Sequence, residues 1–324
     1  MGTRSRAETN GHLSTLPRNE GPAYPRFSSA RLGRIQWDGE AAFRSLSYYF
    51  LLRWNWPGYE STVMHVLRDF EVGPEPSETR RDHAPGSSVC YSLVHSPRAK
   101  RTHKLLYNTH EIYQSSDPSN TLNYLFWHIN SESLSRTADY FLIHAGAVAT
   151  PRGEGILLPA ASGSGKTTLT GALVRAGFGY LSDEAGAIDP ITKRLYPYPK
   201  ALAFKEKKLR DRLGTLVNEH DGSLIDGTWH IHADEIRPGV AASPCEIRYV
   251  ISPRYEAGAD TQITPMTTAE LAFCLGDNAF SLAYYRGRGI SLLAEIARGA
   301  RGFRLVSGDL DDAVAAVATL TNRR

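Results

Sequence analysis

The sequence predicts a protein of the α/β class in which a smaller α+β domain precedes the main α/β domain. From Tyr140 onward, short apolar runs typical of buried strands alternate with stretches of helical periodicity. The stretch before Tyr140 has strand and helix patterns of its own and reads as a separate module. We therefore expect domains at 28–139 and 140–324. The polar segment 1–27 is expected to be a flexible tail.

The 28–139 domain is expected to open with a helix. From Glu40 to Trp54 the apolar residues fall on one helical stripe, which Pro57-Gly58 ends. Strands are predicted for Ser88 to Val94 and for His103 to Gln114, followed by a helix from Ser119 to Thr137. No catalytic pattern is found in this domain.

The 140–324 domain contains several apolar runs of strand length. The predicted strands are Tyr140 to Thr150, Gly155 to Pro159, Phe178 to Ser182, Cys245 to Ser252 and Phe303 to Val306. The predicted helices are one that ends before Gly177, one that begins at Thr267/Thr268, one at Ser291 to Ala297, and one capped by Asp309 that runs through Leu320.

One glycine-rich stretch indicates a specific chemistry. It reads Ala160-Ala161-Ser162-Gly163-Ser164-Gly165-Lys166-Thr167-Thr168 and lies between a predicted strand and a predicted helix. A loop of this kind cradles the phosphates of a nucleotide with its backbone N–H groups, which predicts nucleotide binding by Ser162 through Thr168. Lys166 is expected to face solvent and to neutralise the β- and γ-phosphates, and Thr167 to offer a hydroxyl to Mg²⁺.

An acidic pair follows the next predicted strand. Asp183-Glu184 end the strand after the glycine-rich loop and its helix, and adjacent strands of such a sheet place their C-terminal ends at one edge. Asp183 is therefore expected beside Lys166 and Thr167. His144, on the strand that precedes the loop, is expected to reach the same edge. Phosphoryl transfer needs a carboxylate of this kind to hold Mg²⁺ or to accept the proton of the acceptor.

This combination resembles the HPr kinase/phosphorylase family over residues 141–190. The motifs that carry the likeness are Leu142-Ile143-His144-Ala145-Gly146-Ala147, the glycine-rich loop, and Gly177-Phe178-Gly179-Tyr180-Leu181-Ser182-Asp183-Glu184. The resemblance implies a P-loop domain of HPr-kinase type that by itself holds ATP or GTP with Mg²⁺. It implies that Asp183 is the general base, that Thr167 and Glu184 are metal ligands, and that His144 lies near the transferred phosphate.

Two differences from true HPr kinases concern the acceptor. This chain has Asp183-Glu184 where they have two aspartates, and it lacks their later Arg-Gly-rich signature. The chain is more similar to the divergent HPr-kinase-related proteins, some of which accompany peptide natural-product clusters and phosphorylate a precursor peptide. This likeness implies a serine kinase that acts on a peptide or small protein, with Lys205 as a candidate for contact with phosphate or substrate. Arg237, in the turn Arg237-Pro238-Gly239, is a further candidate. A small-molecule kinase and a regulatory module with little turnover stay open as alternatives.

Composition narrows the partners and the compartment. The net charge is 37 − 34 = +3, which is too mild to predict binding to nucleic acid or to an anionic membrane. The cysteines Cys90, Cys245 and Cys274 lie far apart, which favours a reducing compartment, and there is no apolar run of membrane-span length. We expect a cytoplasmic protein. A homo-oligomer is one of the assembly states that the sequence leaves open.

Overall fold

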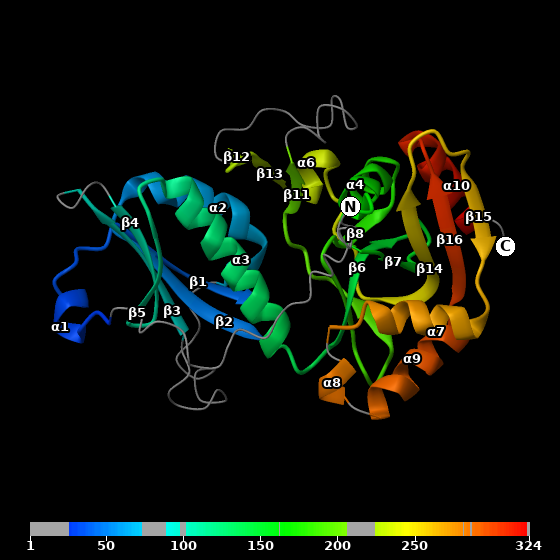
Figure 1. Ribbon diagram of the computed structural model, residues 1–324, viewed down its shortest axis with the longest axis horizontal. Coiled ribbons are helices and arrows are strands. Elements are labelled where there is room, and N and C mark those ends of the chain that lie inside the picture. The colour runs from blue at the N-terminus through cyan, green and yellow to red at the C-terminus, as the bar shows by residue number, and fades with distance from the viewer. Residues whose placement is uncertain are drawn as a thin grey trace, which may run out of the picture.

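The computed structural model describes residues 26–72, 89–97, 102–161, 163–205, 224–280, 282–285 and 287–322. Within these residues the chain has a mixed α/β fold with sheets of five, eight and three strands (Figure 1). The predicted tail lies outside the described residues except for its last two, as does Ser162. No helix in the described part of the chain is long and apolar enough to cross a membrane.

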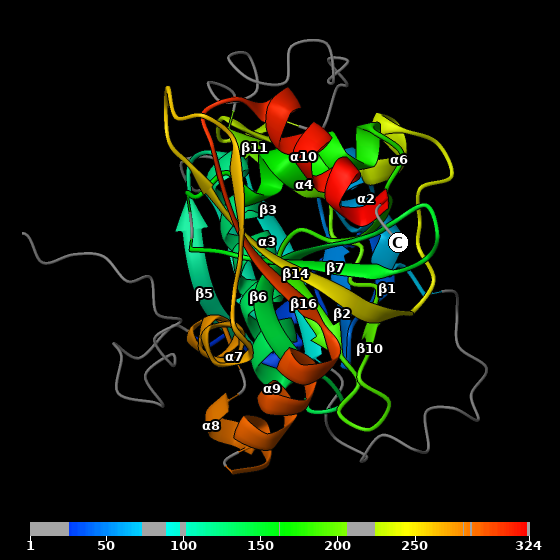
Figure 2. The same cartoon turned by 90° about the vertical axis from the view of Figure 1, so that its right-hand side faces the viewer.

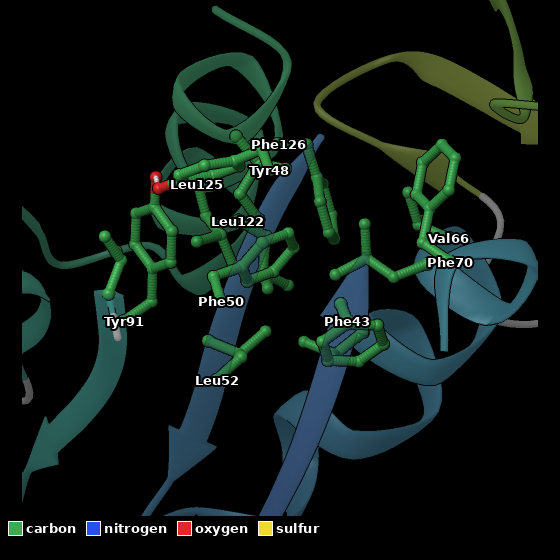
Figure 3. Close-up of a cluster of buried hydrophobic side chains, with 14 of the residues drawn as sticks. Phe43, Tyr48, Phe50, Leu52, Val66, Phe70, Tyr91, Leu122, Leu125 and Phe126 are labelled. Atoms are coloured by element: carbon green, nitrogen blue, oxygen red, sulfur yellow. Dashed lines mark hydrogen bonds between the residues drawn. The ribbon is translucent and has the colours of Figure 1, made fainter. Parts of the chain in front are cut away.

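The N-terminal part, residues 26–139, is built on the five-stranded sheet, whose order is β1-β2-β3-β4-β5. Its strands are β1 (Gly39–Ser45), β2 (Tyr48–Trp54), β3 (Val89–Ser96), β4 (Thr102–Tyr107) and β5 (His110–Ser115), and its helices are α1 (Ser29–Leu32), α2 (Glu60–Leu67) and α3 (Pro118–Arg136). Figure 3 shows the core of this part, where apolar side chains of the sheet meet those of α2, α3 and the 3₁₀ turn Arg68–Phe70. The predicted helix at 119–137 is confirmed as α3.

The helix predicted from Glu40 to Trp54 is wrong. This stretch is an antiparallel hairpin of β1 and β2, and Leu46 at its turn has a positive φ of 55°. The reason lies in β2, where the buried residues alternate with partly exposed ones. Aromatic residues at this spacing favour a pleated, half-buried strand, and that preference overrides the helical stripe. The predicted strand at 88–94 is confirmed as β3, and the one at 103–114 is divided between β4 and β5.

The C-terminal part, residues 140–322, is built on the eight-stranded sheet. Its main order is β10-β9-β6-β7-β14-β16-β15, and β8 also pairs with β6. The strands are β6 (Phe141–Ala149), β7 (Gly155–Pro159), β8 (Gly179–Ser182), β9 (Ala185–Ile188), β10 (Arg194–Tyr196), β14 (Cys245–Tyr255), β15 (Gln262–Pro265) and β16 (Arg301–Ser307). Each strand predicted in this part is confirmed.

Helices pack against both faces of this sheet (Figures 1 and 2). They are α4 (Lys166–Arg175) and α10 (Leu310–Asn322) on one face, and α7 (Thr268–Asp277) and α9 (Gly287–Gly299), with the short α8 (Leu282–Tyr285), on the other. Strand β7 shows how one strand serves both faces, since Ile156 and Leu158 pack toward α4 whereas Leu157 packs toward α7 and α9. The predicted helices of this part are confirmed, including the capping box of Thr267 with Glu270.

A three-stranded sheet connects the two parts (Figure 1). It consists of β11 (Leu202–Lys205), β13 (Thr228–Ile231) and β12 (Leu224–Ile225), and the short helix α6 (Ala233–Ile236) follows it. Asn123 of α3 donates a hydrogen bond to Asp226 at the β12–β13 turn, with Nδ2 and Oδ2 3.2 Å apart. On the other side, Phe204 of β11 packs in the core that contains α4.

The two parts also share charged contacts and a core. Arg68 pairs with Asp234 and Glu235, and the Nδ1 of His232 lies 2.7 Å from the Oδ2 of Asp69. The buried cluster of the N-terminal part includes side chains from the C-terminal part, namely Leu142, Ala185, Ala187, Tyr198 and Ile225. The apolar core of the N-terminal part therefore continues into the C-terminal part.

Candidate functional site

The glycine-rich loop, residues 160–165, joins the end of β7 to the start of α4. Gly163 and Gly165 have φ values of 84° and 92°, a backbone region that favours glycine. Tyr255, at the end of β14, donates its backbone N–H to the carbonyl of Ser164 at 3.3 Å, and this fixes the loop to the edge of the sheet. Of the sequence-predicted loop residues, Thr167 is half-buried and Thr168 is buried on α4.

Lys166 is buried, which corrects the expectation that it faces solvent. Its side chain is 8% exposed, and its Nζ has no hydrogen-bond partner among the residues described. Its stem crosses β6 at Gly146, because a Cβ there would come within 3.3 Å of the Cγ of Lys166. Burial lowers the pKa of Lys166 to about 8, although the negative charges of Glu184 and Asp183 act in the opposite direction. This edge therefore offers an anion a buried ammonium group that has no partner in the described part of the chain.

The acidic pair lies at the sharp connection between β8 and β9. The Oγ of Ser182 accepts hydrogen bonds from the backbone N–H groups of Glu184 and Ala185, both at 3.1 Å. Asp183 is 4% exposed, and its Oδ1 is buried without a hydrogen-bond partner in the described part of the chain. Burial raises the pKa of Asp183, whereas Lys200, Lys166 and a hydrogen bond from Thr167 lower it.

Glu184 differs from Asp183 because it has a cation as a partner. The Nζ of Lys200 lies 2.9 Å from the Oε2 of Glu184, and the two side chains are 21% and 26% exposed. Burial raises the pKa of Glu184, but the charge and hydrogen bond of Lys200, together with Lys166, lower it to about 2. The same pairing raises the pKa of Lys200. The pKa values of the two neighbouring acids therefore shift in opposite directions, and Glu184 is the acid that stays ionised.

His144 lies on the same face of β6 as Gly146, two residues before it. Its backbone N–H donates to the carbonyl of Asn278 at 2.6 Å, and its ring packs against Phe280 at a centroid distance of 5.2 Å. Burial and the charge of Lys166 lower the pKa of His144 to about 4. The imidazole is therefore neutral at pH 7, which makes it a hydrogen-bonding group.

The topology explains why these residues meet. Strand β6 is antiparallel to both β7 and β8, so the glycine-rich loop and Asp183 leave the sheet at the same edge. From the sequence we predict that β7 and β8 are neighbours in the sheet, whereas β6 lies between them. The expected meeting is confirmed through a different arrangement, in which the start of β6 brings His144 to this edge as well.

Two predicted contact residues do not join this cluster. Arg237 donates from Nε to the carbonyl of Val174 at 2.9 Å and from Nη2 to that of Phe178 at 3.0 Å. It therefore caps the C-terminal end of α4, whereas Lys166 begins that helix. Lys205 is exposed at the end of β11.

Lys200 is the residue of the cluster that sequence reasoning missed. It stands directly after the turn Tyr196-Pro197-Tyr198-Pro199. Two lysines follow this turn, Lys200 and Lys205, and the sequence-based prediction names only Lys205 as a site residue. The pairing with Glu184 depends on a fold contact between two connecting segments, one from β8 to β9 and the other from β10 to β11. Among the described residues, no group of three or more His, Cys, Asp or Glu side chains is arranged to hold a metal ion by itself.

Comparison with models of known protein families finds no family that matches this chain, and comparison with curated proteins finds no match.

Proposed function

We propose that this chain is an ATP-dependent P-loop kinase of the HPr-kinase type, which transfers the γ-phosphoryl group to a serine hydroxyl of a peptide or small protein. The observation that carries the proposal is that two buried groups act on each other at one sheet edge, the Nζ of Lys166 and the Oδ1 of Asp183, and neither has a hydrogen-bond partner among the described residues. Buried polar groups without partners are costly, so their presence beside a glycine-rich loop supports a ligand that satisfies both.

The residues present fit Mg·ATP or Mg·GTP. The buried ammonium of Lys166 suits a phosphate oxygen, and the loop backbone at Gly163 and Gly165 leaves room for phosphate to approach. The hydroxyl of Thr167 and the oxygen of Glu184 that Lys200 does not hold are hard ligands of the kind that Mg²⁺ prefers. When bound, ATP would supply the phosphoryl group, and Mg²⁺ would supply the positive charge that neutralises the phosphate oxygens.

The contrast between the two acids supports a division of labour. An acceptor hydroxyl must lose a proton, and a carboxylate with a raised pKa is the stronger base for that step. Asp183 has the raised pKa, and Glu184, held by Lys200, has the lowered one. Asp183 would therefore take the proton, while Glu184 stays anionic. Neutral His144 would donate a hydrogen bond to a phosphate oxygen at this edge, and its lowered pKa supports that role.

The experiment that tests the proposal offers different acceptors to the protein with Mg·ATP labelled on its γ-phosphate. One arm uses a peptide library with fixed serine, threonine or tyrosine, and the second uses small hydroxyl compounds, with Asp183→Asn as the inactive control. Transfer to serine peptides supports the proposal. Transfer in the second arm alone would identify a small-molecule kinase. Binding of ATP without transfer in either arm would identify a regulatory module.

A further inference from the structure

The segment that carries Lys200 is held by both parts of the molecule. It runs from β10 to β11, and its Tyr198 is 1% exposed in the core of the N-terminal part. The ring of Tyr198 stacks on Phe70 at a centroid distance of 5.5 Å, and its hydroxyl donates to the Oδ1 of Asn130 on α3 at 2.9 Å. Both of these contacts come from the N-terminal part.

The C-terminal part holds the same segment from the other side. Tyr198 donates its backbone N–H to the carbonyl of Leu181 at 2.8 Å, and the hydroxyl of Tyr180 donates to the carbonyl of Lys200 at 2.5 Å. Tyr180 and Leu181 belong to β8, which leads directly into Asp183 and Glu184. The contacts of Tyr198 and Lys200 therefore connect α3 of the N-terminal part to the strand that presents the acidic pair.

We propose that the N-terminal part is a positioning element for the acidic pair: through Asn130 and Tyr198 it holds Lys200 against Glu184, and this leaves Asp183 as the acid with a free oxygen. The inference rests on the proposed function for its catalytic consequence, but the positioning itself is a property of the fold. Without this restraint, Lys200 would be free to turn toward either acid, because both carboxylates act on it electrostatically.

In this arrangement Lys200 and Tyr198 are positioning residues, since they act through Glu184. Second-sphere partners of this kind change activity by about 10- to 100-fold when they are removed. The charged and titratable groups around the pair come from several elements, namely Lys166 of α4, His144 of β6, His230 of β13, Tyr180 of β8, and Tyr198 and Lys200 of the connecting segment. Among these cations, Lys200 is the one that contacts a carboxylate directly, at 2.9 Å.

The catalytic test compares Asn130→Ala with Asn123→Ala in the full chain. Both asparagines lie on α3 and both bond to the C-terminal part, but only Asn130 contacts the Lys200 segment. With labelled Mg·ATP and an acceptor, Asn130→Ala is expected to lower kcat about 10-fold, with little change in the KM for ATP, and Asn123→Ala is expected to leave both unchanged. Equal kcat for wild type and Asn130→Ala, or equal loss in both variants, would overturn the proposal.

Rescue by a conservative variant gives a readout that a merely structural role would not move. Lys200→Met removes the cation that contacts Glu184 and is expected to lower kcat about 10- to 100-fold, with little change in the KM for ATP. Lys200→Arg keeps the charge and is expected to restore kcat. An unchanged kcat in Lys200→Met would overturn the assignment of Lys200 as the positioning cation.

A final measurement separates this inference from the proposed kinase activity. The free energy of unfolding in urea is measured for Asn130→Ala, Glu184→Gln and the double variant, with Asn123→Ala in place of Asn130→Ala as the control cycle. The inference predicts that the effects of the Asn130 and Glu184 changes are not additive, whereas those of the control cycle are. If the protein transfers no phosphate but the Asn130 cycle is coupled, the proposed function fails and the positioning stands. Additive effects in the Asn130 cycle would overturn the positioning, whatever the activity.

Discussion

Replacement of Lys166 by methionine is expected to stabilise the protein in the absence of nucleotide while abolishing its affinity for nucleotide. The folded protein buries the ammonium group without a hydrogen-bond partner in the described part of the chain, and burial lowers its pKa from 10.5 to about 8. At about 1.4 kcal/mol for each pH unit, that difference corresponds to an unfavourable contribution of about 3 kcal/mol at pH 7. Methionine keeps most of the apolar stem and removes the charge.

The sign of the effect follows from the direction of the pKa change. Below pH 8 the lysine is charged in both the folded and the unfolded chain, so the full unfavourable contribution is present. Between pH 8 and 10.5 the folded protein loses the proton first, and the contribution disappears. The stability difference between Lys166→Met and wild type should therefore be greatest at pH 7 and should shrink toward pH 10.

The assay is urea unfolding followed by circular dichroism at pH 7 and at pH 9.5. For a chain of this length, about 3 kcal/mol also corresponds to a rise in Tm of about 4 °C, at about 2 cal/mol/K of unfolding entropy per residue. Lys193→Met is the matched control, because Lys193 is 43% exposed and paired with Glu295 at the surface, and it is expected to change stability by less than about 1 kcal/mol. Equal or lower stability of Lys166→Met at pH 7 would refute the reasoning. Added Mg·ATP should stabilise the wild type and leave Lys166→Met unchanged.

Three further predictions concern the fold around the site. His230 is buried, and burial lowers its pKa to about 3, so below pH 6.5 the unfolded chain binds a proton that the folded chain does not. The free energy of unfolding should therefore fall by about 1.4 kcal/mol for each pH unit below 6.5. His230→Phe should flatten that slope, as measured by urea unfolding at about pH 7.5 and about pH 5. Gly146→Ala would place a methyl 2.5 Å from the Oγ1 of Thr170 and should cost about 1–3 kcal/mol in the same assay, whereas Gly299→Ala, which meets nothing within 4 Å, should not destabilise. The fragment 140–324 leaves apolar surface uncovered that the N-terminal part buries, so it should lack a cooperative thermal transition; a sharp one would show that this part folds alone.

Local patterns were sufficient to predict the elements that form the site. The strand, the glycine-rich loop and the helix follow one another in contiguous residues, so local patterns predict all three. The acidic pair at the end of the next predicted strand is a local pattern as well. Because strands of an α/β sheet place functional groups at one edge, the meeting of Lys166 with Asp183 could also be expected. The insertion of β6 between β7 and β8 could not, since strand order depends on pairings between distant segments.

Other features depend on contacts that the sequence does not display. The hairpin of β1 and β2 was predicted as a helix because its apolar residues fit both periods, and packing against α2 and α3 decides between them. Lys200 was passed over for the same kind of reason, since neither composition nor spacing shows that its segment returns to Glu184. The burial of Lys166 at the start of α4 likewise depends on Gly146 of β6, which permits the close approach.

The central claim is that Asp183 acts as the base in phosphoryl transfer, and single-turnover kinetics tests it most directly. Wild type, Asp183→Asn and the neighbouring control Glu184→Gln are saturated with Mg·ATP, and the rate of γ-phosphate transfer to the best acceptor is measured beside nucleotide affinity. Loss of a general base typically lowers the rate by about 10²–10⁴-fold. We predict a loss of that size for Asp183→Asn, with affinity changed only a few-fold. Transfer that stays intact in Asp183→Asn while nucleotide affinity collapses would contradict the account and make Asp183 a metal ligand or structural residue.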